Sequence, residues 1–265
     1  MIQFFLAFIM IFSANSHASA NAWQTQIIED AQKVYKNIAL KEFQKPIEFT
    51  VIDNFSAAAS AKHEYDKLIV EINTGLLKST RLTPDSLRMI ICHEIGHLFG
   101  GAPRKSAPPE WEGPTDENGK SMMSAEGQAD YYASSACFKK LLDLEVKVIP
   151  FSYDTSRVGP VLRNKCINSA GLKGSALEAC FRSALAGLDF LNLVKNFDIS
   201  CELHDDEVVE STMNDTYPSR QCRLDTMING TLCKERLPLA MHEYDASKNT
   251  CLSHYAQRPA CWYKN

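Results

Sequence analysis

The chain has 265 residues, of which 45% are hydrophobic and 23% charged, close to the averages of globular proteins. This composition excludes a disordered chain, a collagen-like chain and a membrane protein with many spans. The 28 basic residues against 32 acidic ones give a net charge of −4, so no nucleic-acid partner is expected from bulk charge.

The N-terminal segment predicts a cleaved signal peptide. Residues 2–12 are almost uninterruptedly apolar, and small residues lead from them to an Ala-x-Ala cleavage signal at Ala18 and Ala20. The apolar run is too short for a membrane anchor, which needs about 20 residues. We therefore expect residues 1–20 to be removed and the protein to be exported to the periplasm or the extracellular space. No stable transmembrane segment is expected after cleavage.

The segment after the signal peptide predicts one helix and two strands. Apolar residues recur with a helical period over residues 23–43, and Pro46 ends this pattern. Residues 47–52 and 67–73 have the composition of strands, and residues 53–66 read as a polar connection between them.

A second helix is expected to begin at Pro84, with Thr83 as its N-cap, and to run to about Phe99. Residues 102–120 contain four prolines and predict a surface loop. The next helix is expected to run to about residue 144, and the sequence offers Ser121 or Ser124 as its cap. Beyond residue 150 we expect short amphipathic helices over about 160–196 and cysteine-pinned loops over about 197–265.

The chain contains nine cysteines, all of them after residue 91. In an exported protein this density predicts disulfide bonds, whose pairing the sequence does not determine. Because nine is an odd number, one thiol is expected to be free. Cys92 is the candidate, since it lies in an apolar part of the second helix.

The second helix carries His93-Glu94-x-x-His97, and this spacing predicts a metal site. Residues four apart on a helix share one face, so the two imidazoles can bind the same ion. Glu94 lies beside them and can take a proton from a water molecule at the metal. A catalytic zinc takes three protein ligands, and no third histidine follows at the spacing of the metzincins. The helix cap, the apolar face and the glycine stop favour a real site over a chance match.

Glu126 and Asp130 are the next candidate ligands, again four residues apart on one helix. One carboxylate can bind the metal while the other hydrogen-bonds to a ligand histidine. The alternative is that both are exposed acids in a first helical turn, where the helix dipole favours them. The upstream motif favours the ligand interpretation.

The motif His93-Glu94-x-x-His97, followed by Glu126-x-x-x-Asp130, resembles the gluzincin family that includes the CaaX prenyl protease and the heat-shock protease HtpX. This resemblance implies a zinc-dependent endopeptidase. It implies His93, His97 and Glu126 as zinc ligands, Glu94 as the general base and Asp130 as a hydrogen-bond partner of a ligand. The family's multiple transmembrane helices have no counterpart here, so a prenylated membrane substrate is not expected.

A third element of the family lies further along the chain. Members tend to carry Thr-His-Pro followed by an arginine, and this chain has Thr-Tyr-Pro at residues 216–218, with Arg223 at the matching place. Tyr217 therefore stands where the family has histidine. Tyr217 can serve as a hydroxyl donor to an oxyanion or as a simple turn residue, and both interpretations stay open.

Together these features predict an α+β, zincin-like fold. Residues 21–150 would form a core with a small sheet, an active-site helix and a ligand helix, and residues 151–265 a mainly helical, disulfide-rich region packed on it. The expected function is zinc-dependent cleavage of a protein or peptide substrate. Residues 67–73 are either the edge strand with which that substrate pairs or an ordinary strand of the sheet. The alternatives are a weakly active or inactive zincin scaffold with a binding or chaperone-like role, and an adhesion module in which the motif is accidental.

Overall fold

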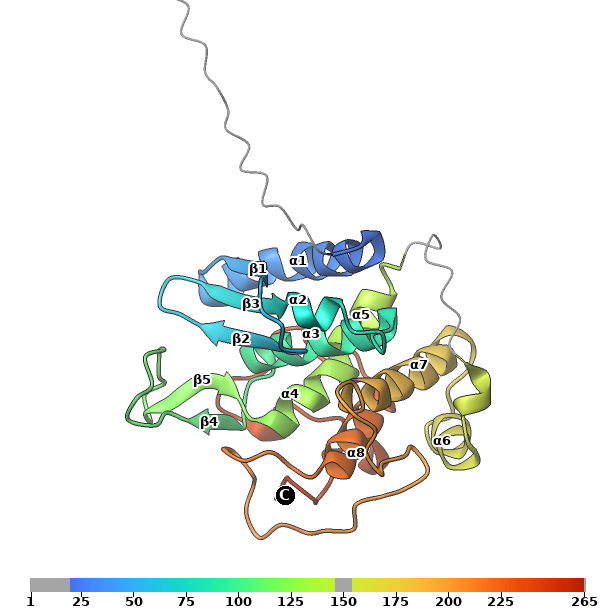
Figure 1. The fold of residues 1–265 in the computed structure, drawn as a ribbon. Coiled ribbons are helices and arrows are strands. Elements are labelled where there is room, and N and C mark those ends of the chain that lie inside the picture. Colours follow the sequence, from blue (N-terminus) through green and yellow to red (C-terminus); the bar gives the residue numbers. More distant parts are fainter. Residues whose placement is uncertain (1–19, 146–153, 265) are drawn as a thin grey trace, which may run out of the picture.

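The computed structural model describes residues 20–145 and 154–264 (Figure 1). The expected signal peptide lies outside the described residues except for Ala20, and so does the expected domain boundary near residue 150. The described part is an α+β structure with two small sheets and many helices. None of its helices combines the length and the apolar character needed to cross a membrane.

The larger sheet has three strands in the order β1-β3-β2. β1 (Ile47–Ile52) runs parallel to the central strand β3 (Leu68–Asn73), and β2 (Ala59–His63) runs antiparallel to it. The prediction of an edge strand at residues 67–73 is therefore wrong, because that segment is paired on both sides. β2 lies within the predicted polar connection; it was missed because Ala-Ser-Ala-Lys-His has none of the β-branched side chains typical of strands.

One face of this sheet packs on α1 (Ala22–Phe43) and on α3 (Pro84–Phe99), and alternate strand residues enter this core. The opposite face carries cross-strand ion pairs between Lys62 and Glu71 and between Lys67 and Glu48, 2.8 and 3.1 Å long. The short helix α2 (Thr74–Leu77) follows β3 directly. The sheet thus packs on one side of α3, as Figure 1 shows.

The central helix of the fold is α3. It begins as predicted, with Thr83 and Ser86 forming a reciprocal capping box and Pro84 in the first turn. Every residue from Asp85 to Phe99 is buried, because α1, β2, β5, α4 and α7 surround the helix. Its polar side chains therefore lie in the interior, where each needs a partner.

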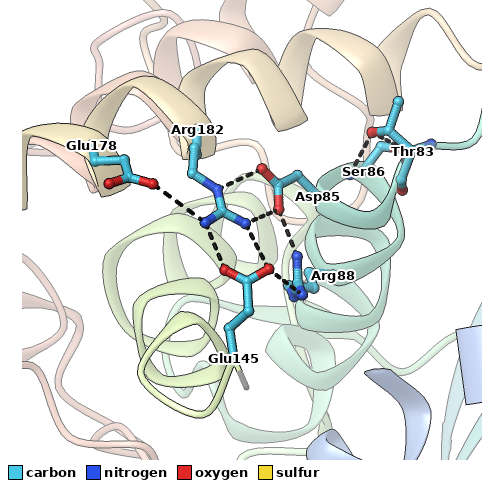
Figure 2. Close-up of polar contacts among 7 residues, drawn as sticks. All are labelled: Thr83, Asp85, Ser86, Arg88, Glu145, Glu178 and Arg182. Atoms are coloured by element: carbon cyan, nitrogen blue, oxygen red, sulfur yellow. Dashed lines mark hydrogen bonds and ion pairs between the residues drawn. The ribbon is translucent and has the colours of Figure 1, made fainter. Parts of the chain in front are cut away.

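A buried network of charges ties the first turn of α3 to α7 (Gly174–Leu191), as Figure 2 shows. Arg182 of α7 donates to Asp85 at 2.8 Å and to Glu145 at 2.7 Å. Arg88 donates to the same two carboxylates at 2.6 and 2.8 Å. The two arginines and two acids balance in charge, so they can be buried together and hold α3 against α7.

One strand lies within the predicted loop, and a second lies where the next helix is expected to begin. β4 (Arg104–Ser106) pairs antiparallel with β5 (Lys120–Ser124) and forms the second sheet. The ligand helix then begins at α4 (Glu126–Tyr132) and continues through the π-helical turn η1 (Ala133–Cys137) into α5 (Phe138–Leu142). Neither serine caps it, because both belong to β5 and the Ser124 hydroxyl donates to the carbonyl of Gly101 at 2.8 Å.

The C-terminal part contains three α-helices besides short turns. They are α6 (Pro160–Asn164), which continues into the π-helical turn η3 (Lys165–Ser169), α7, and α8 (Arg220–Thr231). The short 3-10 turns are η2 (Thr155–Arg157), η4 (Ala246–Lys248) and η5 (His254–Ala256). α8 falls inside the region predicted as loops. It packs on α4 and α7, and Ala186 and Met227 belong to the same hydrophobic core as α1 and α3.

Four disulfides cross-link the chain: Cys92–Cys137, Cys166–Cys180, Cys222–Cys261 and Cys233–Cys251. The free thiol is Cys201, which is buried. The prediction that Cys92 is the free cysteine is wrong. Its apolar surroundings did not exclude a bond, because a half-cystine is itself apolar and its partner Cys137 is equally buried.

Candidate metal centre

Two helices cross closely at Gly96, and this crossing brings the candidate ligands together. A Cβ atom at Gly96 would lie 2.7 Å from the carbonyl oxygen of Ala129 on α4, nearer than real contacts allow. Glycine is therefore required for α3 to approach α4 to this distance. His93 and His97 flank Gly96 on one helix, and Glu126 and Asp130 flank Ala129 on the other.

The Cys92–Cys137 disulfide is a second tie between the same helices. Cys92 directly precedes His93 on α3, and Cys137 lies at the end of η1, in the helix that carries Glu126. The Cα atoms of the two cysteines are 5.5 Å apart. The ligand-bearing helices are thus joined covalently near the ligands themselves.

His93, His97 and Glu126 are close enough to bind one metal ion. Glu126 Oε2 lies 3.4 Å from His93 Nε2, and Glu126 Oε1 lies 3.5 Å from His97 Nε2. One atom of each residue lies within 4.8 Å of the other two. Tetrahedral zinc with bonds of about 2.0–2.2 Å separates its ligands by about 3.3–3.5 Å, so the observed distances fit.

The chemistry of the donors also fits a cation. Glu126 Oε2 is buried and makes no hydrogen bond within the described part of the chain. A buried carboxylate oxygen without a partner is costly unless a positive charge faces it. Two further clusters of possible ligands each contain a disulfide-bonded pair, Cys222–Cys261 or Cys233–Cys251, whose sulfurs are not available to a metal.

Each ligand histidine is oriented through its other ring nitrogen. His97 Nδ1 lies 2.9 Å from the carbonyl oxygen of Ser124, which can only accept, so the Nδ1 proton points there and Nε2 keeps its lone pair. His93 Nδ1 lies 2.8 Å from Asp130 Oδ1. Both Nε2 atoms therefore face Glu126, as metal ligation requires.

The two histidines differ in electrostatic surroundings. Burial lowers the pKa of His97 to about 3. Burial acts in the same direction on His93, but the charge of Asp130 and the hydrogen bonds to Asp130 and Glu126 together exceed it and raise the pKa of His93 to about 9. A carboxylate behind a histidine makes the imidazole a stronger base and therefore a better metal donor.

Asp130 connects the ligands to the C-terminal part of the chain. Arg223 of α8 donates to both of its oxygens, from Nε at 2.7 Å and from Nη2 at 2.8 Å. Burial opposes the charge of Asp130, yet Arg223 and His93 hold the pKa of this carboxyl below its ordinary value. Arg223 Nη2 lies 4.0 Å from Glu126 Oε2. Arg223 therefore stands behind Asp130, beside the ligand set.

Glu94 is buried on α3 between the two histidines in sequence. Burial raises the pKa of its carboxyl, and the charge of Glu126 adds to this, while His93 opposes it. Glu94 directly follows the ligand His93 on α3, so it lies next to the ligand set. A raised pKa makes a carboxylate a stronger base and so a better proton acceptor.

Tyr217 lies on the open side of the centre. Its side chain is 67% exposed, and the ring centroid is 5.6 Å from the Arg223 guanidinium carbon. Partial burial of the hydroxyl, together with the charge of Glu126, raises the pKa of Tyr217 to about 12. The structure thus brings Tyr217 beside a ligand from which it is distant in sequence.

Lys105 also belongs to the centre, although no motif in the sequence points to it. Its Nζ lies 2.7 Å from Glu126 Oε1. It belongs to β4, which falls within a segment predicted as a loop, and a single lysine in such a segment has no informative spacing. Because β4 pairs with β5, the Lys105 side chain lies near Glu126, which follows β5 in the chain.

All seven predicted site residues are therefore gathered in one region, with the metal-binding distances formed by His93, His97 and Glu126. Comparison with known proteins gave no match: no family model, no curated protein and no solved structure was similar to this chain.

Proposed function

We propose that this protein is an exported zinc-dependent endopeptidase. The observation that carries the proposal is the convergence of His93, His97 and Glu126 at metal-binding distances, with Glu94 beside them. A purely structural metal site has no need of the adjacent Glu94. The resemblance of the two ligand motifs to the gluzincin family supports the same conclusion.

The chain's own groups account for the proton transfers that amide hydrolysis requires. When bound, zinc supplies Lewis-acid polarisation of the scissile carbonyl and activates water near neutral pH. Glu94 accepts a proton from the attacking water and passes it to the amine of the leaving fragment. Asp130 and Ser124 hold the two histidines in place during these steps.

β2 is the strand on which we expect a peptide substrate to dock. Hydrogen bonds from Asn73 N to Ala58 O and from Glu64 N to Lys67 O fix which residues of the hairpin face β3. By antiparallel alternation the backbone groups of Ala59 and Ala61 point away from β3, toward the open edge. β2 packs on α3, so a strand added there would lie over the helix that carries the ligands.

The disulfides support an exported location. Four disulfides form in the described structure, and such bonds persist in oxidising compartments such as the periplasm and the extracellular medium. Both locations agree with the expected signal peptide.

The decisive experiment compares oxidatively folded wild type with Glu94→Gln, using β-casein and a quenched fluorescent peptide library. The wild type should cleave in the presence of zinc and lose activity on treatment with a chelator. Glu94→Gln should retain zinc and lose cleavage by about 100-fold or more, because it removes the general base. Undiminished cleavage by this variant would contradict the proposal. Stoichiometric zinc with no cleavage by the wild type would favour the binding role instead.

A further inference from the structure

Lys105 is held against the candidate ligand Glu126 by its neighbours on β4. The Lys105 side chain is 29% exposed, whereas that of Glu126 is 4% exposed. On one side, buried Arg104 contacts Met122 of β5 at 3.0 Å. On the other side, the Ser106 backbone N–H donates to Asp215 at 2.6 Å. The pairing of Arg104 with Ser124 of β5 and the bond from Ser106 N–H hold the strand on both sides of Lys105, whose ammonium contacts Glu126.

The two oxygens of Glu126 have different partners. Oε1 faces Lys105 at 2.7 Å, with His97 Nε2 at 3.5 Å. Oε2 faces His93 Nε2 at 3.4 Å and makes no hydrogen bond. The ammonium therefore fixes the rotation of the carboxylate and leaves the second oxygen directed at the histidines.

Lys105 also determines the charge of the centre. Arg223 balances Asp130, since the two form a bidentate pair. Lys105 is the cation nearest to Glu126, 2.7 Å from Oε1, whereas Arg223 Nη2 is 4.0 Å from Oε2. A ligand set neutralised by a nearby ammonium attracts a divalent cation less strongly and leaves a bound cation more electron-poor.

We propose that Lys105 is a positioning residue for Glu126 whose positive charge lowers the affinity of the centre for divalent metal. This inference rests on the proposed metal site and adds a residue that regulates it. The repulsion between a single and a double positive charge within a few ångströms is strong in a partly buried site. Removing the charge should therefore raise metal affinity, an effect opposite to that of a structural defect.

The test is a zinc titration of the full oxidised chain against a chromophoric chelator at pH 7. Lys105→Met and Lys105→Gln keep much of the side chain and remove its charge, and both should bind zinc at least tenfold more tightly than the wild type. Lys105→Arg keeps the charge and should stay within about threefold of the wild type. Lys62→Met, on the solvent face of the sheet, is the matched control for losing one lysine and should change nothing.

The outcomes separate this inference from the proposed function. A folded wild type that binds no zinc would contradict the metal site itself. A wild type that binds zinc, with Lys105→Met and Lys105→Gln binding equally or more weakly, would overturn only the role assigned to Lys105. Tighter binding by both neutral variants and not by Lys105→Arg would support it.

Discussion

The two described parts of the molecule contribute to the metal centre in different ways. Residues 20–145 contain all three members of the metal-binding cluster, on α3 and α4. Residues 154–264 contribute the groups that hold those helices and ligands: Arg182 at the first turn of α3, Arg223 behind Asp130, and Tyr217 beside Glu126.

The site therefore depends both on local helix spacing and on contacts between segments far apart in the sequence. His93 and His97 are four residues apart, and so are Glu126 and Asp130, a spacing that puts each pair on one face of its helix. The supports are far away along the chain: Arg223 and Asp130 are 93 residues apart, and Arg182 and Asp85 are 97 residues apart. The C-terminal part therefore adds long-range supports to a site whose three ligands all lie in residues 20–145.

The largest effect is expected from breaking the network that joins α7 to α3. Arg182→Leu leaves buried Asp85 and partly buried Glu145 with Arg88 alone, and should lower the free energy of unfolding by about 3–5 kcal/mol. Urea denaturation measures this loss. Lys62→Leu, which breaks a solvent-exposed pair, should cost less than about 1 kcal/mol. Equal costs for the two variants would show that the network does not support α3.

Two disulfides provide the next comparison. Replacing Cys92 and Cys137 by alanine, or Cys166 and Cys180 by alanine, should each cost about 2–4 kcal/mol of stability. Only the first pair joins the ligand helices, so only its loss should weaken zinc binding, by about tenfold or more on the scale of orienting contacts. Chelator competition on both double variants checks this. Equal zinc affinities of the two double variants would show that the Cys92–Cys137 disulfide does not support zinc binding.

A smaller effect is expected at the link between the two parts. Asp130→Asn removes the charge that lies between His93 and Arg223, and should weaken zinc binding by about 10–100-fold. Asp143→Asn, at the exposed end of α5, is the matched control and should leave zinc affinity unchanged. If both variants bind zinc as the wild type does, the orienting role of Asp130 is refuted.

The smallest effect is expected at Tyr217. Tyr217→Phe removes one hydroxyl from a largely exposed side chain, so cleavage should fall by at most about tenfold, with zinc content unchanged. Tyr65→Phe, at a similarly exposed tyrosine in the turn between β2 and β3, is the control and should retain full activity. A loss of about 100-fold or more at Tyr217 would instead assign it the role of an oxyanion donor.

Features with strong local signals were predicted from the sequence. α1 is predicted from its apolar period and α3 from its cap and apolar face, and Thr83 with Pro84 marks the start of α3. The gathering of His93, His97 and Glu126 follows from two helical motifs that need only a close crossing. Gly96 lies inside the motif, but the sequence alone does not reveal that it allows the two helices to approach each other.

The remaining features depend on contacts between distant segments. β2 and β4 are strands because of their partners β3 and β5, since their own side chains have little strand preference. The bond between Cys92 and Cys137 depends on α3 meeting the ligand helix a second time, which no local pattern reveals. The same holds for Lys105, whose role arises only when β4 lies beside the segment leading into α4.

The most direct test of the central claim is the metal content of the mature, oxidatively folded protein, measured by elemental mass spectrometry beside His97→Ala. We predict about one zinc per chain in the wild type and its loss in the variant, because His97 is one of the three clustered ligands. A correctly folded wild type without bound metal would contradict the claim.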